Sequence, residues 1–99
     1  MPTETIQFAN ARQLSQLYAN DARNLEEVES RLKVQLASRD DWIEIKGDME
    51  GIGLVKSLFD LLEAARKQGL RIRASDFHYT LRCVANGEAD ELREIYRNP

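Results

Sequence analysis

Carboxylates, one histidine and one cysteine are the side chains of this 99-residue chain that could take part in catalysis or metal binding. Asp40, Asp41 and Glu44 lie close together, but acid–base chemistry also needs a neighbouring histidine, cysteine or oxyanion donor, and none accompanies them. His78 and Cys83 lack the further ligands that a zinc site requires. The sequence therefore predicts a polar turn around these carboxylates, no catalytic or metal site, and a chain that is not an enzyme and holds no cofactor.

The stretch Gly51–Ser57 contains glycines and a lysine, as phosphate-binding loops do, but its spacing differs from theirs. A P-loop places glycine directly before the lysine, whereas Val55 precedes Lys56 here. The third glycine of the dinucleotide-binding pattern would also fall at Lys56. We expect instead the start of a helix whose small residues pack close to a sheet.

Two groups of basic and amide residues could bind an anionic partner. The first surrounds residues 20–23, where Arg23 and the N–H groups of a helix that follows Asn24 favour an anion, although Asp21 brings a negative charge. The second lies within 64–82, where basic residues outnumber acidic ones by four. The candidates of the first group are Asn20, Arg23, Asn24, Arg31, Lys33 and Arg39, and those of the second are Arg66, Lys67, Arg71, Arg73 and Arg82. Helix capping and solvated charges are the alternative for both groups.

Composition limits the classes of function that these residues can serve. The chain has 14 basic and 17 acidic residues, and a net charge of −3 argues against a domain that coats nucleic acid by bulk electrostatics. Any contact with nucleic acid must therefore be local. The hydrophobic fraction of 42% suits one globular domain, and the single cysteine fits a reducing, cytoplasmic location. No apolar run approaches the roughly 18 residues that cross a bilayer, so we expect no membrane partner.

Hydrophobic spacing predicts the elements that would position these side chains. Alternating apolar residues predict a strand over 5–8 and a hairpin over 33–46 with its turn at 39–41. Helical spacing predicts two short helices, which Asn10 and Asn24 would cap.

The second half of the sequence reads as helical. A long helix begins at Asp48 and stops at Gly69. Ser75 or Asp76 would cap another helix that runs to residue 86, and a final helical turn covers 92–96 in an otherwise polar tail.

This order of elements predicts a two-layer α/β (α+β) fold. Helices would pack on the apolar face of an antiparallel three-stranded sheet, in the β-α-α-β-β-α order of the KH domain, with an extra C-terminal helix. The predicted core is Ile6, Phe8, Leu14, Leu17, Leu25, Val28, Leu32, Val34, Leu36, Ile43, Ile45, Ile52, Val55, Phe59 and Leu62. Trp42 is out of phase with Ile43 and Ile45 and would lie on the opposite face. We expect the last helix to cover it through Phe77 and Leu81, with a partner protein as the alternative.

KH domains bind RNA through the short loop between their first two helices, which clamps about four backbone nucleotides. In this chain that loop is 20–23, and it lacks the two glycines of the usual KH pattern. Asn20 and Asp21 tolerate the left-handed conformation, but less freely than glycine does.

The segments Phe8–Tyr18, Asn24–Val34, Ile43–Gly47 and Ser75–Tyr79 resemble the N-terminal domain of PhoH-like ATPases, the phosphate-starvation-inducible P-loop ATPases of bacteria. The resemblance covers roughly residues 5–96. It implies that residues 1–88 form a KH-like N-terminal domain and that 89–99 begin a linker towards an ATPase domain. It also implies that ATP and Mg²⁺ bind only to that downstream domain, which would assemble into homo-oligomeric rings.

Two functions are therefore expected. In the first, the chain is a non-catalytic KH-like domain that helps to bind or position single-stranded RNA for the ATPase domain. In the second, it is an assembly module that does not bind RNA. It would contact its own ATPase domain, another subunit or a ribonuclease through the Trp42 face or the basic segment Arg66–Arg82.

Overall fold

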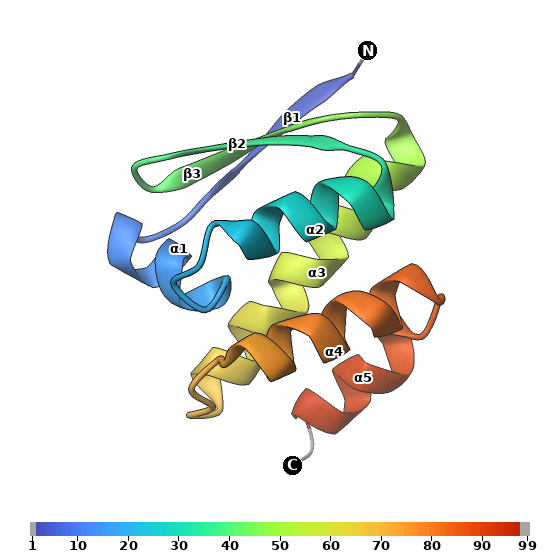
Figure 1. Ribbon diagram of the computed structural model, residues 1–99. Helices are drawn as coiled ribbons and strands as arrows, with labels where there is room; N and C mark the ends of the chain where they lie inside the picture. The colour runs from blue at the N-terminus through green and yellow to red at the C-terminus, as the bar shows by residue number, and fades with distance from the viewer. Residues whose placement is uncertain (1, 98–99) are drawn as a thin grey trace.

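Residues 2–97, which the computed structural model describes, form three strands and five helices (Figure 1). In chain order these are β1 (Thr3–Gln7), α1 (Ala11–Leu17), α2 (Arg23–Leu32), β2 (Gln35–Arg39), β3 (Trp42–Lys46), α3 (Met49–Lys67), α4 (Ala74–Ala85) and α5 (Ala89–Arg97). The predicted α+β class, with an antiparallel three-stranded sheet, is confirmed.

The sheet has the order β1-β3-β2, and both pairings are antiparallel. A two-residue turn joins β2 to β3, and its first residue, Asp40, has a φ of 48°. Ile43 and Ile45 of the central strand face the helices and are fully buried, as the alternating pattern predicts.

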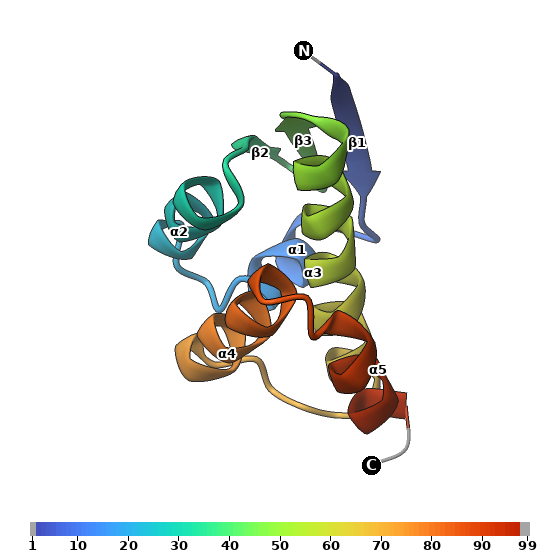
Figure 2. The ribbon, with the colours of Figure 1, turned by 90° about the vertical axis from the view of Figure 1, so that its right-hand side faces the viewer.

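The helices lie on one side of the sheet (Figure 2). α2 and α3 pack beneath the strands, and the long α3 continues beyond the sheet, where α4 and α5 pack against it. Because α3 is covered by the sheet at one end and by helices at the other, Leu61 is as buried as the predicted core residue Leu62. The whole predicted core is buried or packed against the buried cluster.

Two of the predicted helix starts are confirmed and two are wrong. The Asn10 side chain accepts a hydrogen bond from the Gln13 amide, and Asp48 accepts one from the Gly51 amide. The prediction that Asn24 caps α2 is wrong, because this helix already includes Asn24 and its N-cap is Ala22. The N-cap of α4 is Arg73, so the caps predicted at Ser75 or Asp76 are also wrong, although the Asp76 carboxylate accepts the Arg73 amide at 2.9 Å.

Helix α5 belongs to the packed helical region. The sequence predicted that a linker begins at residue 89, whereas Leu92 of α5 is 3% exposed and joins the core. Cys83 of α4 is a free, buried cysteine in the same cluster. None of the helices within residues 2–97 is long and apolar enough to cross a membrane.

Trp42 lies on the outer face of the sheet, in one row with Gln7 of β1 and Arg39 of β2. The prediction that α4 covers it is wrong, because α4 packs against α2, α3 and α5, away from the outer face of the sheet (Figure 2), and Phe77 and Leu81 are fully buried there. Trp42 is half-buried on a face that no helix within the described residues covers.

Candidate anion-binding site

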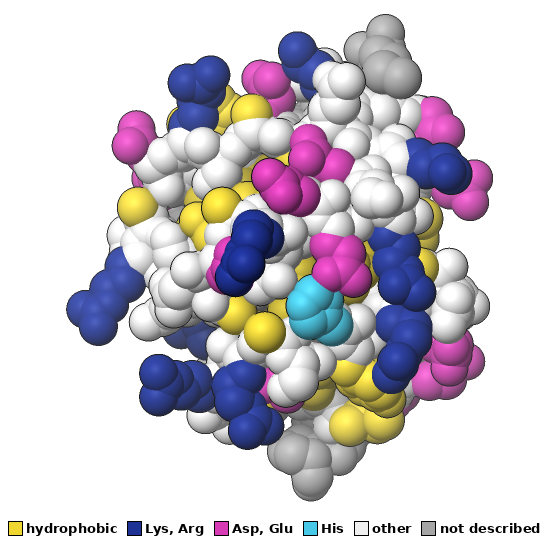
Figure 3. Space-filling view, viewed as in Figure 1, with side chains coloured by type: hydrophobic (Ala, Val, Ile, Leu, Met, Phe, Trp, Pro, Cys, Tyr) yellow, Lys and Arg dark blue, Asp and Glu magenta, His cyan; other side chains and the backbone are white. Residues whose placement is uncertain are grey.

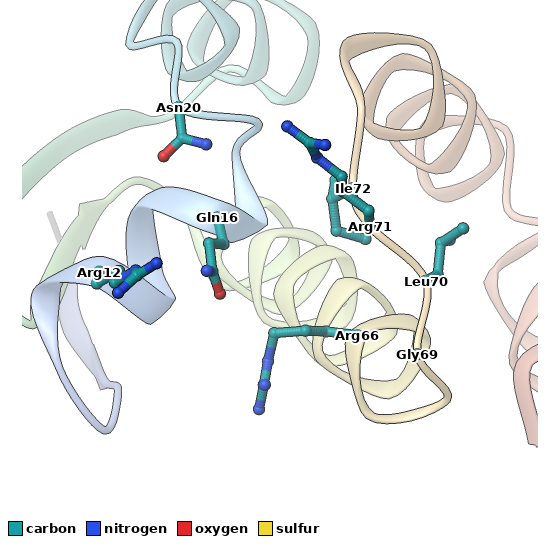
Figure 4. A pocket seen from close by; sticks show the side chains of 8 residues that line it. All are labelled: Arg12, Gln16, Asn20, Arg66, Gly69, Leu70, Arg71 and Ile72. Atoms are coloured by element: carbon teal, nitrogen blue, oxygen red, sulfur yellow. The ribbon is translucent and has the colours of Figure 1, made fainter.

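A pocket of about 560 Å³ lies between α1 and the connection from α3 to α4 (Figure 4). Its lining residues, called the arginine pocket below, are Arg12, Gln16, Asn20, Arg66, Gly69, Leu70, Arg71 and Ile72. Three of them carry positive charge, two carry amides, and none is acidic. The pocket therefore offers cationic and neutral donors to an anion.

Each part of the chain contributes donors for a local structural reason. Arg12 and Gln16 are four residues apart on α1, so they share one face of that helix. Gly69 has a φ of 94° and ends α3, which turns the chain so that Arg71 extends towards the loop that holds Asn20 (Figure 4). Arg66 comes from the last turn of α3.

The three arginines differ in how far they are neutralised. The Arg66 guanidinium donates to the Glu63 carboxylate, which also accepts from the Gln13 side chain at 3.1 Å. Arg12 and Arg71 are exposed, and neither side chain makes a hydrogen bond or ion pair within residues 2–97. Because free guanidinium groups are suited to phosphate and carboxylate, these two are the strongest candidate ligands.

The ionised Glu63 carboxyl makes a pH-dependent contribution to the stability of the fold. Its hydrogen bonds to Arg66 and Gln13 hold the pKa of Glu63 below its ordinary value. A carboxyl with a lowered pKa stabilises the fold above its unfolded pKa and loses that contribution as the pH falls through the folded value. We therefore expect the acid side of the pH–stability profile, below about pH 4.3, to flatten in Glu63→Gln. Urea unfolding between neutral and acid pH measures this, and an unchanged acid slope would contradict it.

The loop between α1 and α2 does not present the free helix N-terminus that was expected. The Arg23 amide donates to the Asp21 carboxylate at 3.0 Å, and the Asn24 amide donates to the Asp21 carbonyl at 3.0 Å. The Asp21 carboxylate also binds the Arg23 guanidinium at 2.8 Å, which lowers the pKa of Asp21 and raises the pKa of Arg23. The next amide, that of Leu25, donates to the Ala22 carbonyl at 3.0 Å, so the expectation of unsatisfied N–H groups directly after Asn24 is wrong.

Asn24 itself is 5% exposed, and its side-chain amide donates to the Tyr18 carbonyl at 2.9 Å. Its side chain is thus committed to holding the loop. Ala19 and Asn20 both adopt the left-handed conformation, with φ values of 60° and 57°. Asn20 is exposed, so this backbone geometry presents its amide to the arginine pocket.

Ala19 is strained because a left-handed conformation costs an L-residue about 1–2 kcal/mol. We expect Ala19→Gly to raise the free energy of unfolding by about 0.5–1 kcal/mol. This gain is smaller than the strain it relieves, because glycine also loses more backbone entropy on folding. Ala22, with a φ of −61°, is the matched control, and glycine there should not stabilise. Urea unfolding of the two variants measures the difference, and equal effects would contradict it.

The other candidate residues lie elsewhere. Arg31 and Lys33 line a smaller pocket of about 220 Å³ together with the acidic Asp48 and Glu50. Arg39 lies on the outer face of the sheet.

Three members of the second group of basic residues also lie outside the arginine pocket. Arg73 binds Asp76 at 3.3 Å, and the Arg82 guanidinium lies 5.6 Å from the centre of the Tyr79 ring. Lys67 is exposed but does not line the arginine pocket. His78 binds Glu27 of α2 at 2.7 Å, and residues 2–97 contain no cluster of three potential metal ligands.

The structure thus joins one member of the first predicted group, Asn20, with two of the second, Arg66 and Arg71. Figure 3 shows Lys and Arg side chains gathered over the lower left of the molecule, where Figure 1 places the end of α1 and the α3–α4 connection. Sequence reasoning missed Arg12 and Gln16, whose spacing on one helix face was the available signal.

Comparisons with protein-family models, curated proteins and solved structures found no match for this chain. The resemblance to PhoH-like ATPases therefore stays a prediction.

Proposed function

We propose that this chain is a non-catalytic, KH-like domain that binds the phosphate backbone of single-stranded RNA in the arginine pocket, in support of a PhoH-like ATPase domain. The observation that carries the proposal is the convergence of three arginines with Asn20 of the α1–α2 loop in one pocket without a carboxylate lining it. Arginine is the side chain best suited to phosphate recognition.

The order of elements supports the KH-like part of this proposal. β1, α1, α2, β2, β3 and α3 follow in the KH sequence around an antiparallel sheet of order β1-β3-β2. The loop between α1 and α2 has two consecutive left-handed residues, Ala19 and Asn20, so it adopts backbone conformations that glycine usually supplies. The KH loop that contacts nucleotides occupies this position.

Phosphate binding by a few arginines fits the overall charge of −3, because it needs only a local positive surface. Contacts to phosphate carry no base information, so we expect little sequence preference. Three phosphate contacts should give a slope of log affinity against log salt of about −2, at about −0.7 per contact for single strands.

The decisive experiment is titration of the full chain with fluorescent octauridine at several salt concentrations. We expect Arg71→Glu and Arg12→Glu each to weaken binding about tenfold or more, and Arg71→Ala to reduce the salt slope by about 0.7. Arg82→Glu is the matched control, because Arg82 belongs to the same predicted basic segment but lies against Tyr79 outside the pocket. Equal losses in Arg71→Glu and Arg82→Glu, or no binding by the folded chain at low salt, would refute the proposal.

A second function, protein assembly without RNA binding, is favoured by one observation. Trp42 is half-buried on the outer sheet face, which the helices of the described residues leave uncovered. Aromatic residues on such faces are typical of interfaces. The ATPase domain and a ribonuclease are the proposed partners. Binding of either one to the chain that fails with Trp42→Thr, in the absence of RNA binding, would favour this function.

A further inference from the structure

The edge of the sheet along β1 presents backbone groups that no other strand uses. The Phe8 amide donates to the Asp41 carbonyl at 2.8 Å, and the Gly47 amide donates to the Pro2 carbonyl at 3.3 Å. Because hydrogen bonding alternates along an antiparallel strand, the N–H and C=O groups of Thr3, Thr5 and Gln7 point away from β3. Within residues 2–97 these groups have no hydrogen-bonding partner on the edge.

The opposite edge of the sheet is protected by α2. On β2, the outward-facing Leu36 amide donates to the Glu29 carboxylate of α2 at 2.9 Å, and α2 packs against this strand. Proteins protect sheet edges in this way because unpaired backbone groups pair readily with other chains. The two edges therefore differ within residues 2–97, because α2 protects the β2 edge at Leu36 and no helix does this along β1.

A second pocket, of about 430 Å³, borders the open edge and is lined by residues of β1 and α3. These two elements lie side by side (Figure 2). Its apolar floor includes Phe8 and Phe59, whose rings meet edge to face with their centres 5.8 Å apart. The next inward-facing residue of β1, Ile6, completes this floor.

The two carboxylates that line this pocket, Asp60 and Glu63, differ in how many partners they already bind. Glu63 binds Arg66 and Gln13. The pocket's lysine, Lys56, binds Glu4 of β1, which lies outside the lining. The Asp60 side chain is 70% exposed and has one contact, with Arg93 at 3.5 Å. Asp60 is therefore the carboxylate most available to an incoming cation.

We propose that the β1 edge binds an extended peptide segment of a partner protein, which adds to the sheet as a fourth strand and places a lysine or arginine in the pocket. Alternate side chains of an added strand point towards the helices, which is where the pocket lies. The aliphatic part of the basic side chain covers Phe8 and Phe59, and its charged end meets Asp60. This site is separate from the arginine pocket and does not depend on RNA binding.

The test uses a synthetic heptapeptide in which threonines alternate with valine, arginine and valine, so that the three latter side chains share one face. We expect binding to shift the amide signals of Thr3, Thr5 and Gln7 and to slow their hydrogen exchange. Methylating one of the peptide nitrogens that face β1 should weaken binding about tenfold, the effect of losing one hydrogen bond of about 1.4 kcal/mol.

Two variants and one control distinguish the contribution of the β1 backbone to peptide binding from that of the pocket. Thr5→Pro removes an outward N–H that no strand uses, so the sheet should tolerate it while peptide binding is lost. Ser38→Pro, at an outward position of the β2 edge, is the control that should bind normally. Asp60→Asn should weaken the arginine peptide about fivefold, as expected for a partly exposed ion pair of about 1 kcal/mol, and leave a glutamine-containing peptide unaffected.

Equal binding of the methylated peptide, or normal binding by Thr5→Pro, would overturn the proposal. Protection of the same amides in concentrated protein without peptide, together with dimers in sedimentation, would also overturn it, because a second copy would then be the occupant. Arg71→Glu should bind the peptide with unchanged affinity. Peptide binding therefore tests this proposal independently of whether the arginine pocket binds RNA.

Discussion

Replacing Gly51 with alanine should lower the free energy of unfolding by about 1–3 kcal/mol, the usual effect of overpacking a core. A Cβ atom at this position would lie 2.8 Å from Cγ1 of Val34 and 3.2 Å from the Leu32 carbonyl oxygen. Val34 is β-branched and buried, and the carbonyl belongs to the backbone, so neither can move away easily. The start of α3 is thus closely packed at Gly51, but against Leu32 and Val34, which precede β2, rather than against the sheet as expected.

Gly53 provides the matched control, because it lies two residues further along α3 and a Cβ there would meet no atom within 4 Å. We expect Gly53→Ala to raise the free energy of unfolding by about 0.5–1 kcal/mol, since alanine favours the helix. Urea unfolding of the two variants should therefore show changes in the free energy of unfolding of opposite sign for the same glycine-to-alanine substitution. Stabilisation by Gly51→Ala would show that α3 does not pack against Val34 as described.

The largest loss of stability is expected for Phe77→Ala, at about 3–5 kcal/mol. Phe77 is fully buried in α4, so its removal leaves a cavity among the helices that pack beyond the sheet. A domain of this size has about 5–15 kcal/mol of stability in total, so the variant should unfold at a much lower temperature. Thermal unfolding followed by circular dichroism measures the change.

Tyr79 is the control for this substitution, because it is aromatic, lies on the same helix and is 46% exposed. The Arg82 guanidinium lies over its ring, and because the side chain is largely exposed, Tyr79→Ala should lower stability by less than about 1 kcal/mol. Equal losses from the two variants would mean that α4 does not bury its apolar face against the rest of the molecule.

The sequence predicts elements well where one face of an element is apolar. The hairpin, the buried stripe of α3 and the caps at Asn10 and Asp48 follow from local spacing. Caps were missed where another residue satisfied the helix start first. Asn24 is a good cap by type, but the Asp21 carboxylate accepts the Arg23 amide and the helix begins earlier. Local sequence does not reveal that competition.

The arginine pocket was only partly predictable for a different reason. The sequence grouped basic residues by their closeness along the chain, which joined Arg71 with Arg73 and Arg82. The pocket instead groups residues by the path of the chain after Gly69, which brings Arg71 near α1 and leaves Arg82 against Tyr79. That path depends on how α4 packs on α3, and hydrophobic spacing gives the buried faces of helices but not their relative placement.

The single cysteine makes the helical region chemically observable. Cys83 is 7% exposed in α4, and a buried thiol reacts with disulfide reagents only after its surroundings open. Since the chain has one thiol, the rate of its labelling reports how often α4 separates from its neighbours, without any introduced probe. The labelling rate of Cys83 therefore measures local opening of the helical region, independently of any opening of the sheet.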